Sequence, residues 1–233
     1  MKQYRQVHYV ERKPHAMRES VGRIIETLRS VRKQKKIFLF LIAFFFFIDG
    51  VYTIIDMATA YGSALGLDST GLLLALLVTQ FVAFPFSILF GRLAEKYDTG
   101  KLILTCIAAY MGITVFAVFM KAQWQFWVLA IFVGMFQGGI QALSRSYFAK
   151  IVPPERSGEY FGLMDICGKG ASFMGTTVVG LASQAFGSIN IGISAIVFLF
   201  LAGALFFMKT EHSGSESMKN QENVVMGQQM FHD

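Results

Sequence analysis

Long apolar stretches alternate with short polar segments between Ile37 and Met208. A bilayer core about 30 Å thick is crossed by roughly 20 apolar helical residues. Lipid cannot satisfy an open backbone, so such segments must be α-helices. The pattern therefore predicts an all-α membrane protein with six transmembrane helices, at Ile37 to about Tyr61, Gly71–Gly91, Leu102–Met120, Trp124 to about Phe148, Gly158–Phe186 and Ile189–Met208.

Two polar segments flank this domain of residues 37–208. Within residues 1–36, apolar positions follow the spacing of one helical face over residues 14–32 and are flanked by arginines. This amphipathic helix either lies on the inner membrane surface or forms a solvated linker helix. Residues 209–233 are polar and mixed in charge, and we expect a disordered cytosolic tail. The apolar face of the first segment consists of Met17, Val21, Ile24, Ile25, Leu28 and Val31.

The composition agrees with lipid as the main solvent. Mean hydropathy is +0.50 and 15% of the residues are charged, against about 25% in soluble domains. Residues 1–36 contain eleven Lys or Arg and three Glu, a net charge of +8, whereas the whole chain carries +6. No aromatic-interleaved RNA motif or zinc-ligand spacing accompanies the basic segment, so we expect a lipid bilayer and no nucleic acid as its partner.

The distribution of basic residues predicts the orientation. The loops on one side of the predicted bundle carry a single basic residue, Lys121, together with Asp68. Trp124 and Trp127 stand on the same side, where they would form an outer interfacial belt. The positive-inside rule then puts both termini in the cytosol of an integral membrane protein, in the cell membrane if the source is prokaryotic. The basic side holds the N-terminal segment together with Arg92, Lys96, Lys101, Arg145, Lys150, Arg156 and Lys209.

Enzyme signatures do not occur. All four histidines lie in the terminal segments, and the HExxH, GxSxG and Walker A spacings are missing. The sequence Gly168-Lys169-Gly170 lacks the earlier glycine of a phosphate loop, because Leu163 stands there. Cys106 and Cys167 fall inside spans and form no CxxC pair. We therefore expect no catalytic residue, no metal site and no cofactor, and an intramembrane enzyme is the least favoured reading.

The first span carries two carboxylates. Asp49 lies twelve residues into it, about 18 Å deep at the helical rise. A charge at that depth usually faces a cavity or a partner. Asp49 is therefore either a proton or substrate site or a carboxylate hydrogen-bonded within the bundle. Asp56 shares its face but nears the outer edge.

The fourth span contains a polar stripe. Gln137 and Gln141 are separated by four residues and Ser144 continues their face. These side chains either bind a polar solute or join helices by hydrogen bonds. Arg145 is close to the cytosolic end, where snorkelling or loop packing is favoured.

The fifth span contains Asp165 and Lys169 at a spacing of four residues, which permits a salt bridge. Such a pair either gates a solute path or contacts substrate, or else it only stabilises the packing of the helices. Six glycines in this span suit close helix contacts or a hinge, and Pro85 should kink the second span.

Two motifs suggest a family. The loop after the second span contains Gly91, Glu95, Lys96, Gly100 and Lys101 and resembles the cytoplasmic loop motif of the major facilitator superfamily. A longer match comprises residues 136–148, 153–155 and 157–162, then Asp165 and Gly168-Lys169, together with residues 47–51. With these stretches the chain is similar to the vacuole-effluxer-like family, whose fungal members export amino acids released by autophagy.

The resemblance implies twelve spans in two six-helix halves, of which this chain resembles the second. Residues 1–36 would then be the cytosolic linker between the halves. The family's solute path lies between halves, so the resemblance implies a complementary N-terminal half, or a second copy, as partner.

We hypothesise half of a secondary transporter that moves small polar solutes, with amino acids as one candidate, by alternating access. Asp49, Gln137 and Gln141 would line the path and the pair of Asp165 and Lys169 would brace the fifth span. The loop motif would latch the cytoplasmic side. The alternative is a non-transporting scaffold, assembly subunit or split-gene remnant. Candidate gate residues at helix ends are Asp56, Arg145 and Glu159.

Overall fold

A computed structural model describes residues 26–230 of the chain, with side chains described through residue 213. In this range the long elements are all α-helices and no strand occurs. Residues 26–33 form a short helix, here called the linker helix. The elements that follow are α2 (Lys35–Ala64), α3 (Ser69–Lys96), α4 (Thr99–Val118), α5 (Gln123–Ile151), the 3-10 turn η1 (Pro154–Arg156), α6 (Ser157–Phe186) and α7 (Ile189–Met230).

Local sequence signals set several helix boundaries. The Asp68 side chain accepts a hydrogen bond from the Gly71 amide at 2.7 Å and begins α3. Asp98 does the same for the Lys101 amide at 3.0 Å and begins α4. Gly187, with φ of 65°, ends α6 in a left-handed conformation that suits glycine. The connections are therefore short, and consecutive helices run antiparallel.

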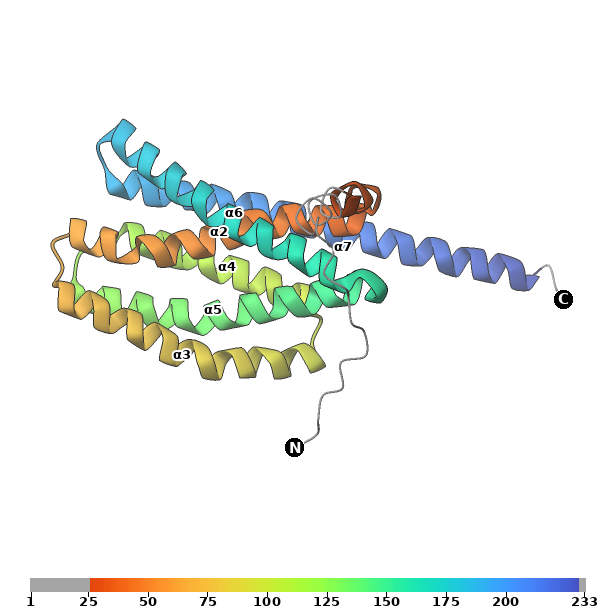
Figure 1. The fold of residues 1–233 in the computed structure, drawn as a ribbon. Helices are drawn as coiled ribbons and strands as arrows, with labels where there is room; N and C mark the ends of the chain where they lie inside the picture. The colour runs from red at the N-terminus through yellow and green to blue at the C-terminus, as the bar shows by residue number, and fades with distance from the viewer. Residues whose placement is uncertain (1–25, 231–233) are drawn as a thin grey trace, which may run out of the picture.

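The long helices lie side by side in one bundle, and the linker helix runs across their direction at one end (Figure 1). Helix α3 packs mainly on α5, while α2 packs on α6 and α7, and α4 joins α5 to α7.

The core is rich in phenylalanine. The Phe40 ring stacks on Phe148 at a centroid distance of 5.3 Å and on Tyr147 at 5.2 Å. Phe200 stacks on Tyr110 at 5.5 Å.

Five helical segments are long and apolar enough to cross a membrane: α2, α3, α4, α5 and Ile189–Ser213 of α7. This confirms an all-helical membrane protein. Helix α6 is not among the five, because its charged residues and glycines lower its mean hydropathy. It nevertheless runs along the same bundle for 30 residues (Figure 1), and its crossing of the membrane as the fifth of six spans stays a prediction.

The basic loops gather at one end of the bundle. The Lys150 ammonium donates to the Thr99 hydroxyl at 2.9 Å, which joins the end of α5 to the start of α4. Arg156 contacts Thr27 of the linker helix at the same end. At the opposite end, the Asp68 amide donates to Gln123 at 3.2 Å. The alternation of ends expected from the sequence is therefore present, and which end faces the cytosol stays a prediction.

Only part of the predicted amphipathic segment is described, because residues 14–25 lie outside the described residues. In the linker helix, Val31 is buried and Leu28 is partly exposed. The hydroxyl of Ser30 and the amide of Gln34 bond with the Tyr160 hydroxyl of α6, at 3.3 and 3.1 Å. This end of the linker is therefore docked on the bundle.

Helix α7 continues to Met230, past the predicted end of the sixth span at Met208. The backbone of residues 209–230 is thus helical, where we expected a disordered tail. This stretch has no proline and many good helix formers, and extending an existing helix costs little once it is nucleated. Residues 231–233 lie outside the described residues.

Candidate functional site

Polar side chains from three helices meet on one exposed side of the bundle, here called the polar face. The Arg145 guanidinium donates to the Asp165 carboxylate at 2.8 Å, with 57% and 49% of the two side chains exposed. The Ser172 hydroxyl donates to Asp56 at 2.8 Å. The polar face consists of Tyr52 and Asp56 from α2, Arg145 from α5, and Asp165, Lys169, Ser172 and Thr176 from α6.

Helical periodicity explains the contribution of α6. Asp165, Lys169, Ser172 and Thr176 stand at positions i, i+4, i+7 and i+11, which share one side of a helix. The other side is buried against α2 and α7. Helix α6 is therefore amphipathic within the bundle. Its buried residues are Tyr160, Leu163, Met164, Gly168, Ala171, Gly175 and Val179.

The ion pair on this face differs from the pair that the spacing permits. Asp165 bonds to Arg145 of α5, and among the described residues no ion pair joins it to Lys169. The guanidinium reaches across the helix interface and offers several donors in a fixed plane, which suits a carboxylate. Lys169 is exposed on the polar face. Arg145 thus contacts α6 directly, where the sequence favoured snorkelling or loop packing.

Asp49 lies behind the polar face, in the α2–α6 interface. It is 0% exposed, and its Oδ1 accepts the Gly175 amide at 2.8 Å and the Thr53 hydroxyl at 3.5 Å. Its second oxygen is buried without a hydrogen-bond partner among the described residues. In this conformation Asp49 joins two helices, and a role in the solute path stays a prediction.

Gly175 makes that contact possible. A Cβ at this position would overlap the Thr53 hydroxyl and the Asp49 carboxylate. Only glycine therefore lets the backbone of α6 approach α2 closely enough for its amide to reach Asp49. Asp49, Thr53 and Gly175 are called the α2–α6 clasp below. The sequence showed the glycine content of α6, but not which glycine meets a carboxylate.

The side-chain amides of α5 are less exposed than the charged groups of the polar face. Gln137 is partly buried, and its carbonyl oxygen has no hydrogen-bond partner among the described residues. Gln141 is also partly buried. The Ser144 hydroxyl donates back to the Ile140 carbonyl at 2.6 Å, so it does not extend the stripe as a free polar group.

Glycines beside these amides set the distance between α5 and α3. A Cβ at Gly138 would stand 2.6 Å from the Ala83 carbonyl, and one at Gly134 would stand 2.6 Å from the Thr79 carbonyl. In the sequence, Gly138 was recognised only as part of a family motif. A period of four between small residues is the signal that indicates such packing.

The loop motif divides into two structural parts. Gly91, Glu95 and Lys96 are exposed at the end of α3, and among the described residues no ion pair includes them. Gly100 is buried in α4, where a Cβ would stand 2.8 Å from the Glu211 carboxyl carbon of α7. The Lys101 amide completes the α4 cap. Closure of the cytoplasmic side by charge pairing of Glu95 and Lys96 therefore stays a prediction.

Tyr147 and Glu159 make further contacts at the basic end. The Tyr147 hydroxyl donates to Glu211, which joins α5 to α7 beside Gly100. Glu159 accepts from Thr27 at 3.0 Å and from Arg156 at 2.7 Å. Hydrogen bonding and attraction from Glu159 raise the pKa of the Arg156 guanidinium above its usual value. Glu159 thus holds the linker helix to the start of α6.

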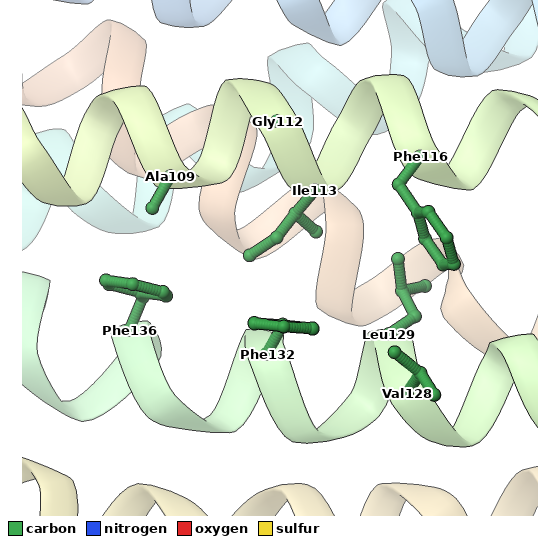
Figure 2. A pocket seen from close by; sticks show the side chains of 8 residues that line it. All are labelled: Ala109, Gly112, Ile113, Phe116, Val128, Leu129, Phe132 and Phe136. Atoms are coloured by element: carbon green, nitrogen blue, oxygen red, sulfur yellow. The ribbon is translucent and has the colours of Figure 1, made fainter.

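One large cavity lies away from these polar groups. A groove of about 290 Å³ opens between α4 and α5, and Figure 2 shows the rings of Phe132 and Phe136 facing Ile113 and Ala109 across it. All eight lining residues are apolar. Such a surface suits hydrocarbon and offers nothing to orient a polar solute. Across the described residues, no three His, Cys, Asp or Glu side chains gather as a metal site would require.

Comparison with known proteins gives the chain a family context. Residues 2–219 match the family described as vacuole effluxer Atg22-like. YxiO of Bacillus subtilis strain 168, named an uncharacterized MFS-type transporter, is 42% identical over 223 residues, covering 96% of this chain and 52% of the relative. Autophagy-related protein 22-2 of Aspergillus niger is 23% identical over 220 residues, covering 87% of this chain and 37% of the relative.

Autophagy-related protein 22 of Saccharomyces cerevisiae strain YJM789 is 29% identical over 178 residues, covering 69% of this chain and 33% of the relative. The chain therefore spans about half the length of the bacterial relative and about a third of the fungal ones.

Proposed function

The chain belongs to the vacuole effluxer Atg22-like family, and we propose on that premise that it forms one half of a major-facilitator-type secondary transporter. The half would move a small polar solute across the membrane by alternating access. Amino acids are the candidate solutes that the family suggests. The complementary partner would be a second six-helix unit facing the polar face.

The observation that carries this proposal is the polar face itself. Arg145 and Asp165 are about half exposed, although both stand in long helices of an otherwise apolar bundle. A charged group facing acyl chains is costly, so intramembrane charges usually face a water-filled cavity or another protein surface. The polar face therefore supports a solute path between this chain and a second unit.

The polar face offers complementary charges to a polar solute. Lys169 is exposed, and among the described residues it forms no ion pair. Asp56 is exposed and retains acceptor capacity beyond its bond from Ser172. A cation and a carboxylate on one wall suit a solute that carries both charges, as amino acids do. Helix α6 would be the fifth of six spans, shielded from lipid on this side by the partner.

The α2–α6 clasp supports the same mechanism. Alternating access requires each half to move as a rigid body around the central site. The bond from the Gly175 amide to Asp49 fixes α6 on α2, so Asp56 and Asp165 keep their relative positions during that movement. In this proposal Asp49 positions the polar face, and the basic end faces the cytosol.

Transport in reconstituted vesicles tests the proposal. The full chain would be reconstituted alone and together with the N-terminal half of a family member, and efflux of a labelled amino acid mixture would be followed. We expect flux only when both halves are present, and at least tenfold less flux with Lys169→Gln. Lys121→Gln, at the opposite end, is the matched control for loss of one positive charge. Equal flux from both variants would contradict a role for the polar face.

A charge exchange separates recognition from packing. The double variant Arg145→Asp with Asp165→Arg retains an ion pair between α5 and α6 but reverses its polarity. If the pair only braces the helices, the double variant transports like the unmodified chain. If the polar face orients the solute, the double variant folds normally, by thermal unfolding in detergent, but its flux remains low.

A further inference from the structure

A second groove opens under the linker helix, at the basic end of the bundle. Its volume is about 280 Å³. Three elements form its walls, and no lining side chain carries a charge. The principal lining residues are Leu28 and Val31 of the linker helix, Phe38, Ile42 and Phe45 of α2, and Cys167 of α6.

The linker groove is separate from the polar face. Cys167 lines the groove, whereas Asp165 and Lys169 are two residues away on either side in the sequence. At 3.6 residues per turn, a step of two residues turns a helix by about 200°. The groove and the polar face therefore lie on opposite sides of α6. The residues that line the groove are none of those that form the polar face.

Basic side chains stand at the mouth of the linker groove. Lys35 precedes Phe38 by three residues and Ile42 by seven, so it shares the groove side of α2 and stands at its outer end. Arg32 follows Leu28 by four residues on the linker helix. Both side chains are exposed, and neither forms an ion pair within the described residues. The mouth is cationic, while the interior is apolar.

We propose that the linker groove binds an anionic phospholipid from the surrounding leaflet. One acyl chain occupies the space beside Phe38 and Phe45, and the phosphate lies at Arg32 and Lys35. The groove is open along a membrane-spanning helix, so hydrocarbon is the medium that meets its walls. Lys and Arg beside the end of a span attract anionic headgroups. This charge pattern distinguishes the linker groove from the groove between α4 and α5.

The bound lipid would stabilise the docking of the linker helix. The hydrogen bonds of Thr27, Ser30 and Gln34 hold that helix to the start of α6. An acyl chain packed against Leu28 and Val31 would fill the other side, between the linker helix and α2. The position of the linker helix would then depend on the lipid composition of the membrane.

Native mass spectrometry of the full chain tests this proposal. The protein would be released from nanodiscs containing equal amounts of phosphatidylglycerol and phosphatidylcholine. We expect one retained phosphatidylglycerol per chain, and about tenfold weaker retention in the double variant Arg32→Gln with Lys35→Gln. The matched control, Lys33→Gln with Lys36→Gln, removes the same charge away from the mouth and should retain the lipid. Lys33 stands five residues from Leu28, on the far side of the linker helix, and the Lys36 ammonium lies over the Tyr147 ring.

Fluorescence quenching gives an independent readout of position. Leu28→Trp adds an indole at the groove, whereas the two natural tryptophans, Trp124 and Trp127, stand near the opposite end. We expect phosphatidylglycerol with brominated chains to quench the added emission more than brominated phosphatidylcholine does. This preference should disappear when Arg32 and Lys35 are also replaced.

Three results would overturn the proposal. The first is equal retention of the two lipids by the unmodified chain, and the second is equal loss in the mouth variant and its control. The third is an added emission that neither brominated lipid quenches, because another part of the protein or a second copy would then cover the groove.

Discussion

Helices α3 and α6 are similar in length and differ in what they expose. Both pack one side on the bundle and leave the other uncovered. Helix α3 exposes large apolar side chains, with Phe81 at 78% and Phe84 at 70%. Helix α6 exposes Asp165 and Lys169 in addition to large apolar side chains such as Phe173, which is 77% exposed. The first surface is suited to lipid or to an apolar partner, whereas the second combines charged with apolar side chains.

The difference shows that helix hydropathy and membrane exposure need to be considered separately. Helix α3 is one of the five segments apolar enough to span a membrane, and only 17% of the residues in its apolar stretch are buried. Helix α6 is not one of the five, although it lies along the same bundle (Figure 1). A polar helix in such a bundle indicates a protein or water interface, because lipid would not tolerate its charges.

The largest effect is expected from placing a charge on the apolar face. Phe81 stands twelve residues into α3, about 18 Å from its start. Phe81→Lys should cost about 3 kcal/mol in membrane insertion, measured as the inserted fraction by glycosylation mapping. Thr176→Lys on the polar stripe of α6 is the comparison variant and should insert almost normally. Equal insertion of both variants would remove the distinction between the two faces.

A smaller effect is expected from crowding the α2–α6 clasp. Gly175→Ala places a methyl group against Thr53 and Asp49 and should lower the free energy of unfolding by about 2 kcal/mol. Thermal unfolding in detergent would measure the change. Gly180→Ala, in the same helix, meets open space and should leave stability unchanged or raise it slightly. If both variants unfold alike, α6 does not approach α2 as described.

The acceptor at Asp49 should matter more for stability than its charge. Asp49→Ala removes the acceptor of the Gly175 amide and should cost about 1.5 kcal/mol of unfolding free energy. Asp49→Asn keeps a carbonyl oxygen there and should cost less than half as much. Chemical unfolding of both variants checks this order. If Asp49→Asn abolishes flux while remaining stable, the charge itself is needed for transport.

The smallest effect on stability is expected for the pair of Arg145 and Asp165. Both side chains are about half exposed, and exposed pairs contribute roughly 0.2–1 kcal/mol. A double-mutant cycle with Arg145→Gln and Asp165→Asn would measure their coupling. A value of several kcal/mol in the assembled transporter would show that a partner has covered the polar face and removed water from the pair.

Much of the helical framework was predictable from the sequence. Five of the six predicted spans fall within one observed helix, because a long apolar run satisfies both the helical backbone and lipid. The third, Leu102–Met120, continues two residues past the end of α4 at Val118. Most of the other observed ends extend beyond the apolar runs. Helix α3, for example, runs Ser69–Lys96 where Gly71–Gly91 was predicted. Internal hydrogen bonds continue into water, so loss of hydropathy does not end a helix.

The pairing of polar groups was less predictable. The sequence allowed Asp165 to pair with Lys169, but the structure pairs it with Arg145 from another helix. It also left open whether Asp49 faces a path or the bundle, and its carboxylate bonds to Gly175, 126 positions away. Such choices depend on the rotation and crossing of helices, which spacing along one helix does not specify.

The sequence by itself determined that this chain is helical, is a membrane protein and carries a few ionisable groups within its spans. The length, helical period and hydropathy of a segment are local properties, so they can be seen in the sequence. The tertiary structure alone decided which of those groups share an exposed surface and which are enclosed. The physical reason is that a charge gains its partner through contacts between helices, and a single glycine such as Gly175 determines whether two backbones come close enough to make them.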